Sequence, residues 1–357
     1  MRFDVTSAAW WRGAPVSEAE LRSDGNAFTL LRWILATTVM FSHGWDLTQF
    51  RTGLDPSVPI LGMPVSRLAV ALFFSLSGYL VIGGLLRRGV RTFLVNRALR
   101  LLPGLWVMLI VVSVGLWLLF SDVSALAFFT APETREFVLR NGSLIGGGYF
   151  LPGIFRDVPT SGVNGSLWTI PYEVRCYLAL AVLAAAGLTQ PLRRLTALIL
   201  VVMALHLIVP DALMPAMATT RRLTFAFLLG VLAWLWRGRI RLSWPLALVG
   251  AVIVLAVPVA WGVQMPAMQI GFGYLLLVSA FRLPAGVRTL SQKLPDYSYG
   301  IYIYAYPAQQ VAVSFGISEP LPNIACGFAL MLPFAAASWH LVEAPALAMK
   351  RRSLLRT

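Results

Sequence analysis

The feature that most constrains the fold is a succession of apolar stretches, each long enough to cross a lipid bilayer, along almost the whole chain. A membrane-spanning helix needs about 20 predominantly apolar residues, and the bilayer core offers no water to exposed backbone groups. The sequence therefore predicts an all-α polytopic membrane protein with about ten transmembrane helices in one bundle. The expected spans, with boundaries good to a few residues, are 27–47, 68–86, 101–120, 166–187, 191–209, 221–236, 245–262, 266–282, 296–315 and 322–348.

The composition agrees with a membrane protein. Hydrophobic residues make up 58% of the chain and charged residues 12%, about half the usual charged share of a soluble domain, so an ordinary soluble globule is excluded. Cys176 and Cys326 both fall in expected spans, so no disulfide framework is predicted. The first 25 residues lack an apolar core followed by a small-residue cleavage site, and we interpret them as a polar arm rather than a signal peptide.

The distribution of positive charge predicts the topology. The net charge is +14, and most of the Lys and Arg residues fall in alternate connecting segments, beginning with the N-terminal arm. This is the positive-inside pattern, which places both termini in the cytoplasm beside an anionic inner leaflet and argues against a nucleic-acid partner. The cations expected on the outer side are Arg51, Arg67, Arg135, Arg140, Arg156, Arg221 and Arg222.

Three segments follow from this topology. Residues 1–25 are expected to form a cytoplasmic N-terminal arm, residues 26–348 the transmembrane domain, and residues 349–357 a basic cytoplasmic tail. The long interruption at 121–165 lies on the outside and is rich in Gly and Pro. Because loops of this length without clear periodicity are usually functional or disordered, we expect part of it to fold back over the outer mouth of the bundle.

Two ionisable side chains stand out in the first span. Arg32 and His43 are eleven residues apart, which puts them on one helix face with a separation of about 16 Å along the axis. Ionisable groups inside a span are costly and by default mark function. The alternatives are that Arg32 is a snorkelling anchor and that His43 bonds to a headgroup or a loop carbonyl.

Glu173 is the candidate partner of His43. It is expected about 10 Å below the outer end of its span, a depth comparable with that of His43. A carboxylate there could orient the imidazole and raise its basicity. The alternative is a structural contact of Glu173 with Arg175 or a tyrosine hydroxyl.

The stretch FFSLSGYL places Ser75, Ser77 and Gly78 near the middle of a span. Small residues at this depth most often permit close helix packing. We expect packing here, whether or not Ser77 also touches a substrate.

Arg97 and Arg100 belong to a basic segment that enters the membrane. They are three residues apart on an expected helix, an arrangement that suits the phosphates of a nucleotide-containing ligand. Glu343, near the inner end of the last span, is their expected counter-charge.

The stretch DYSYGIYIYAYPAQQ opens the ninth expected span with five tyrosines, which suit either interfacial anchors or a polar-lined cavity. They are Tyr297, Tyr299, Tyr302, Tyr304 and Tyr306. His206 and His340 are interpreted as structural. The sequence has no Walker loop, no GxSxG motif and no His/Cys/Asp cluster, so neither a metal site nor a permanently bound cofactor is expected. The residues alone do not separate an enzyme from a carrier.

Taken in order, these residues resemble the membrane-bound acyltransferase-3 family, bacterial enzymes that O-acylate surface and secreted carbohydrates. The resemblance runs from about Asn26 to Pro345. It rests on Arg32 with His43, on Phe73, Phe74, Ser77 and Gly78, on Arg97, Arg100 and Pro103, on Asn164, Ser166, Trp168 and Glu173, on Tyr299, Tyr302 and Pro307, and on Glu343 with Pro345. The chain departs from the family pattern at Thr29, where many members have Asp, and at Ala305, where many have His.

The resemblance implies an acyltransferase of the bacterial inner membrane. It would move an acyl group, with acetyl expected, from cytoplasmic acyl-CoA to a hydroxyl of a cell-surface or exported carbohydrate. His43 would be the catalytic base or the acyl carrier, with Glu173 orienting it and Arg32 lining the channel for the donor. The donor site would include Arg97, Arg100, Ser77 and Tyr302.

Two other classes stay open. The first is a carrier or flippase for glycans or lipid-linked sugars, with Arg32, His43 and Glu173 along its path. The second is a structural subunit of a polysaccharide-export complex, and a homo-oligomer is compatible with any of the three. Acetylation of surface polysaccharide in cells with and without the protein separates the enzyme from both.

Overall fold

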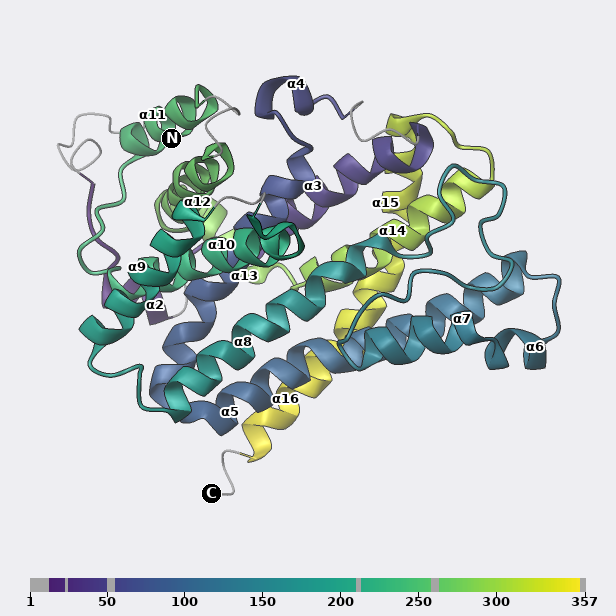
Figure 1. Ribbon diagram of the computed structural model, residues 1–357, viewed down its shortest axis with the longest axis horizontal. Coiled ribbons are helices and arrows are strands. Elements are labelled where there is room, and N and C mark those ends of the chain that lie inside the picture. Colours follow the sequence, from purple (N-terminus) through teal and green to yellow (C-terminus); the bar gives the residue numbers. More distant parts are fainter. Residues whose placement is uncertain (1–12, 23–24, 50–54, 210–212, 258–262, 354–357) are drawn as a thin grey trace.

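The computed structural model describes residues 13–22, 25–49, 55–209, 213–257 and 263–353 (Figure 1). These residues are predominantly helical, and no β-strand forms among them apart from an isolated antiparallel bridge between Ala14 and Leu242. The all-α prediction is therefore confirmed.

Each expected span coincides with one or more helices. They are α3 (Phe28–Gln49), α5 (Val65–Phe120), α8 (Ile170–Ala185), α9 (Leu192–Ile208), α10 (Ala218–Leu235), α11 (Trp244–Leu255), α12 (Gln264–Arg282), α14 (Ser298–Ser314), α15 (Pro320–Ala337), the π-helix η7 (Ser338–Glu343) and α16 (Ala344–Ser353). The last part of the expected span 245–262 lies outside the described residues.

Five helices among the described residues are long and apolar enough to cross a membrane. They are Val65–Phe120, Gly165–Ala185, Pro215–Leu235, Gln264–Arg282 and Pro320–Met349. The first expected span is not in this group; α3 carries Arg32, His43 and Asp46 together with several Thr, Ser and Gln residues. The number of ten spans and the cytoplasmic termini stay predictions.

Helix α5 joins two spans that we expected to be separate. The helix runs from Val65 to Phe120, and only Gly89 inside it has non-helical dihedral angles, with φ 75° and ψ 171°. The intervening segment is rich in Arg and Leu, which favour helix, and Gly is the residue that adopts a positive φ most readily. The two arms of α5 consequently run in different directions (Figure 1).

Helices α5 and α10 pack backbone to backbone. A Cβ atom added to Gly78 would lie 2.1 Å from the carbonyl oxygen of Phe227, and one added to Gly230 would lie 1.8 Å from that of Ser75. The Ser75 hydroxyl donates a hydrogen bond of 2.9 Å to the Ala226 carbonyl. The packing role expected of the small residues is confirmed, and it leaves Ser77 to face another part of the bundle.

The segment 121–165 contains three short helices that we did not expect: α6 (Ala125–Thr130), α7 (Pro132–Arg135) and the π-helix η2 (Glu136–Arg140). Its last part returns to the bundle, where the Gln310 side chain donates hydrogen bonds of 2.7 Å and 2.6 Å to the carbonyls of Thr160 and Gly162. The segment thus folds back onto α14.

The arm before α3 lies against the ends of other helices. Arg282, at the end of α12, pairs with Glu20 of α2 (Glu18–Arg22) and donates hydrogen bonds of 2.9 Å and 3.1 Å to the carbonyls of Ala14 and Pro15. Helix α13 (Ala285–Lys293) packs nearby, because its Ser291 hydroxyl accepts a hydrogen bond from the Leu30 amide of α3. Residues 1–12 of the expected arm and 354–357 of the expected tail lie outside the described residues.

Candidate functional site

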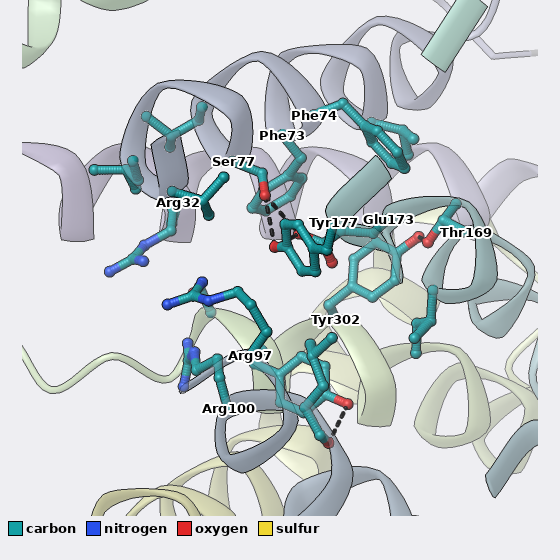
Figure 2. Close-up of a pocket in the computed structure, with 18 residues that line it drawn as sticks. Arg32, Phe73, Phe74, Ser77, Arg97, Arg100, Thr169, Glu173, Tyr177 and Tyr302 are labelled. Atoms are coloured by element: carbon teal, nitrogen blue, oxygen red, sulfur yellow. Dashed lines mark hydrogen bonds between the residues drawn. The ribbon is translucent and has the colours of Figure 1, made fainter. Parts of the chain in front are cut away.

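A narrow cavity of about 130 Å³ lies among α3, α5, α8 and α14. It is lined by every predicted site residue except His43, namely Arg32, Ser77, Arg97, Arg100, Glu173 and Tyr302. Figure 2 shows the guanidinium groups of Arg32, Arg97 and Arg100 pointing toward one side of this pocket. Residues separated by up to 270 positions therefore meet at one place.

Two of the three arginines are held by carboxylates. Asp296 binds both of them, with its Oδ2 atom 2.9 Å from Arg32 Nη2 and 2.7 Å from Arg100 Nη2. Arg100 also pairs with Glu343 at 2.6 Å, as expected of that counter-charge. Asp296 was not among the site residues predicted from the sequence. The signal was present, because a carboxylate at the start of a span containing other polar residues is a natural partner for a buried cation.

Glu343 is buried in the π-helix η7. Its other carboxylate oxygen accepts a hydrogen bond of 2.9 Å from Ser338, and the side chain has no exposed surface. The Arg100 guanidinium also lies over the rings of Tyr299 and Trp339, at 5.7 Å and 5.6 Å from their centroids. Arg100 is therefore fixed on several sides at once. π-Helical turns of this kind are frequent at functional sites.

Arg97 differs from its two neighbours. It lies over the Tyr177 ring at 5.7 Å, and no carboxylate among the described residues forms an ion pair with it. The Arg32 Nε atom is likewise buried without a hydrogen-bond partner among the described residues. The pocket therefore keeps positive charge and a free donor, which suit an anionic or carbonyl-bearing ligand.

Glu173 belongs to a triangle of polar groups. Its Oε1 atom accepts hydrogen bonds from the Ser77 hydroxyl, at 2.8 Å, and from the Tyr177 hydroxyl. The two hydroxyls are themselves 2.7 Å apart. Arg175 instead lies over the Tyr172 ring at 5.0 Å. His43, Arg175 and a tyrosine hydroxyl were considered as partners of Glu173. Of these three, the structure shows the contact with a tyrosine hydroxyl, that of Tyr177.

His43 lies at the other end of α3, outside the lining of the pocket. Its Nδ1 atom is 3.6 Å from Asp46 Oδ2, and its ring meets the Tyr306 ring edge to face at 5.1 Å. The carboxylate beside the imidazole is thus Asp46 and differs from the predicted partner, Glu173. The reason is local: Asp46 is three residues further along the same helix face, whereas Glu173 is held by two hydroxyls.

The tyrosines of α14 connect the two ends of α3. Tyr299, Tyr302 and Tyr306 share one helix face, and α14 packs along α3. Tyr299 contacts Arg100, Tyr302 lines the pocket, and Tyr306 contacts His43. A line of aromatic and hydroxyl groups therefore runs from the arginines to the histidine, as a polar-lined cavity would require.

The stretch NGSLW holds this line in place. The Asn164 side chain accepts a hydrogen bond from the Ser166 amide and donates one of 2.8 Å to the Ile303 carbonyl of α14. A Cβ atom on Gly165 would lie 2.6 Å from the Tyr306 ring, so only glycine lets the ring approach this closely. In the same stretch of chain, the Thr169 hydroxyl lies 2.7 Å from the Tyr302 hydroxyl of α14.

The two remaining histidines make structural contacts. The His206 Nδ1 atom lies 2.7 Å from the Val202 carbonyl of the same helix, and His340 Nε2 lies 2.8 Å from the Tyr297 hydroxyl. Of the positions that depart from the family pattern, Ala305 is buried in α14 and Thr29 is partly buried at the start of α3.

Comparison with known proteins finds a matching family and two related proteins. The family described as "Acyltransferase domain" matches residues 26–340. "Nodulation protein 10" of Rhizobium leguminosarum bv. viciae is 29% identical over 93% of this chain and 95% of its own. "O-acetyl transferase" of Shigella phage Sf6 is 27% identical over 89% of this chain and 95% of its own. No solved structure matches significantly. Because the family match spans most of the chain and all the residues of the pocket, the protein belongs to the acyltransferase-3 family.

Proposed function

We propose that this protein is an O-acetyltransferase of the bacterial inner membrane. It moves an acetyl group from cytoplasmic acyl-CoA to a hydroxyl of a cell-surface or exported carbohydrate. The observation that carries the proposal is the convergence of Arg32, Arg97, Arg100 and Glu173 on one pocket in a chain of an acyltransferase family. A relative that covers most of the chain and is named O-acetyl transferase supports the choice of acetyl.

The donor binds from the Arg97 side of the pocket. Arg97 has no carboxylate partner among the described residues, so its guanidinium is available to a CoA phosphate. The charges of Arg32 and Arg100 are neutralised by Asp296 and Glu343. In this proposal these two side chains therefore form part of the pocket wall. The cavity of about 130 Å³ is smaller than most small-molecule sites. It takes part of the extended arm, while the nucleotide stays on the basic segment of α5 and the acyl end reaches beyond the pocket toward His43.

The acceptor reacts at the His43 end. His43 takes the proton of the acceptor hydroxyl at Nε2, because Nδ1 faces Asp46. The acceptor oxygen attacks the thioester carbonyl, the carbon–sulfur bond breaks, and the proton passes from the imidazole to the leaving thiolate. Asp46 positions the ring and stabilises the imidazolium, the role first assigned to Glu173. The alternative route, through an acyl group carried on His43, uses the same residues.

The two ends are about 16 Å apart along α3, so the acyl end of the donor must extend between them. Tyr302 and Tyr306 lie along this distance and offer hydroxyls to polar groups of the extended arm. In this proposal Glu173, with Ser77 and Tyr177, orders the wall of the channel beside Tyr302.

The test is the His43→Ala variant. We expect it to abolish acetyl-CoA-dependent labelling of surface polysaccharide while expression and thermal unfolding stay unchanged. A matched control is His340→Gln, which changes a helix histidine outside the pocket. Near-normal labelling in His43→Ala would contradict the proposal that His43 is the catalytic base. Unchanged acetylation with failed glycan export in a deletion strain would favour the carrier.

A further inference from the structure

A second basic cavity lies at the end of the bundle where α5, α10 and α12 begin and α9 ends. It has a volume of about 410 Å³ and is lined by Arg67, Arg221, Arg222, His206 and Gln269, among apolar residues. All three arginines belong to the few cations expected on the outer side of the membrane. Because loops on that side tend to lack Lys and Arg, the positive-inside rule does not explain why three arginines surround this cavity.

The cavity keeps a net positive charge. None of the described residues that line it is an Asp or Glu. Asp211 is the only carboxylate in the connecting segment 209–217; it lies outside the described residues and can offset at most one of three charges. Arg221 donates hydrogen bonds to the carbonyls of His206 and Val209, which end α9. Arg67 is exposed, and its side chain has no polar partner among the described residues.

An apolar cavity adjoins the basic one. It has a volume of about 420 Å³, lies among α5, α9, α10 and α12, and is lined mostly by aliphatic side chains such as Leu200, Leu232 and Leu276. Gln269 lines both cavities. Its Nε2 atom donates to the Arg222 carbonyl at 3.1 Å, while its Oε1 atom is buried without a hydrogen-bond partner among the described residues. Buried amide oxygens are normally satisfied, so this atom suits a ligand hydroxyl.

We propose that the two cavities form one binding site for a phosphate-headed lipid. The phosphate binds at the arginines, the hydroxyl-bearing part of the headgroup meets Gln269, and the hydrocarbon chain lies in the apolar cavity. A free phosphate would have no use for the apolar cavity, and a neutral lipid none for the arginines. This site shares no lining residue with the Arg32 pocket except Leu76, so it does not depend on acyl transfer.

The binding experiment uses purified full-length protein and three related probes, with adducts counted by native mass spectrometry. Palmitoyl lysophosphatidic acid has both phosphate and chain, monopalmitoylglycerol lacks the phosphate, and glycerol phosphate lacks the chain. We expect a one-to-one adduct with the first probe and affinities at least about tenfold weaker for the other two. Equal binding of monopalmitoylglycerol or of glycerol phosphate would overturn the proposal.

Two pairs of variants test the two halves of the site. Arg67→Gln should weaken lysophosphatidic acid binding about tenfold, whereas Arg135→Gln, at an exposed arginine away from the cavity, should not. Gly273 lines the apolar cavity, and a Cβ atom there would meet nothing within 4 Å. Gly273→Phe should therefore fill the cavity and weaken binding without disturbing the helix.

Gly250 is the matched control for the second pair, since a Cβ atom there is equally unopposed and the residue lines neither cavity. Both glycine variants should show the unfolding temperature of the parent protein. Full lipid binding by Arg67→Gln and by Gly273→Phe would overturn the proposed lipid site. An equal loss of binding in the controls Arg135→Gln and Gly250→Phe would also overturn it.

Discussion

The two ends of α3 hold their ionisable residues in different ways. At one end Arg32 shares the Asp296 carboxylate with Arg100, which also binds Glu343, all at 2.6–2.9 Å. At the other end His43 faces Asp46 at 3.6 Å, a distance beyond a good hydrogen bond. One end is a network of fixed charges, and the other holds a single loosely paired imidazole.

The difference follows from what each group must do. Arginine stays charged, so burying it in the bundle requires a carboxylate partner and hydrogen bonds. A general base must gain and lose a proton during each turnover, so a tight permanent ion pair would work against it. Under the proposed function, binding therefore belongs to the Arg32 end and proton transfer to the His43 end.

The largest effect is expected where the network is broken. Asp296→Asn removes the carboxylate that two partly buried arginines share, so it should lower the free energy of unfolding by about 3 kcal/mol. Thermal unfolding of the purified protein in detergent measures this. The control is Asp157→Asn, at an exposed loop carboxylate. Equal stability of Asp296→Asn and the parent protein would mean that the Arg32 end is not a structural network.

The corresponding change at the other end should spare stability and reduce turnover. In Asp46→Asn the imidazolium loses the nearby carboxylate charge. At an effective dielectric constant of about 20, two unit charges about 4 Å apart attract by up to about 4 kcal/mol, and solvent screening of this partly exposed pair leaves roughly 2 kcal/mol, so kcat should fall roughly ten- to a hundredfold. The KM for acyl-CoA and the unfolding temperature should stay constant. Asp46→Glu should recover part of the rate. A change in KM with kcat unchanged would instead assign Asp46 to substrate binding.

The positions of the helices could be predicted from the sequence because the bilayer permits few alternatives for a long apolar stretch. The path of α5 could not. A segment such as Arg97 to Leu102 suits a basic loop as well as a helix. In the structure it is helical, and the chain changes direction earlier, at Gly89, whose dihedral angles are not helical. The short helices within 121–165 were missed for a related reason: they are too short to have a clear period.

The site was predicted in part. Arg32, Ser77, Arg97, Arg100, Glu173 and Tyr302 could be found because each belongs to a recognisable motif, whereas Tyr177 and Thr169, which also line the pocket, belong to none of the motifs. The partners were harder. Asp296 stands at a helix boundary, where carboxylates are common for other reasons, and depth alone suggested Glu173 for His43 although Asp46 is three residues away. Depth along a span does not say which way a side chain points.

A smaller effect should separate Arg97 from its neighbours. Arg97→Gln removes the one pocket arginine without a carboxylate partner among the described residues, so the KM for acyl-CoA should rise about tenfold while kcat and stability hold. Steady-state kinetics in detergent measure this, and the exposed Arg91→Gln is the control on the same basic segment. A loss of stability like that of Asp296→Asn would place Arg97 in the fixed network instead.

The smallest effect concerns the contact that ties the N-terminal arm to the Arg32 end. Partial burial raises the pKa of Glu20, but hydrogen bonds from Ser17 and the charge of Arg282 outweigh it and leave this pKa below its usual value. A carboxylate with a lowered pKa in the folded state contributes stability above its unfolded pKa, and that stability is lost as the pH falls through the folded pKa.

Glu20→Gln should therefore lower the unfolding temperature near neutral pH, and the difference from the parent protein should vanish in acid. Because the pair is partly exposed, its contribution stays below about 1 kcal/mol. Thermal scans from about pH 7 down to about pH 3 measure it, with the more exposed Glu18→Gln as the control. A constant difference at every pH would instead show that Glu20 stabilises the fold through packing and that its charge contributes nothing measurable.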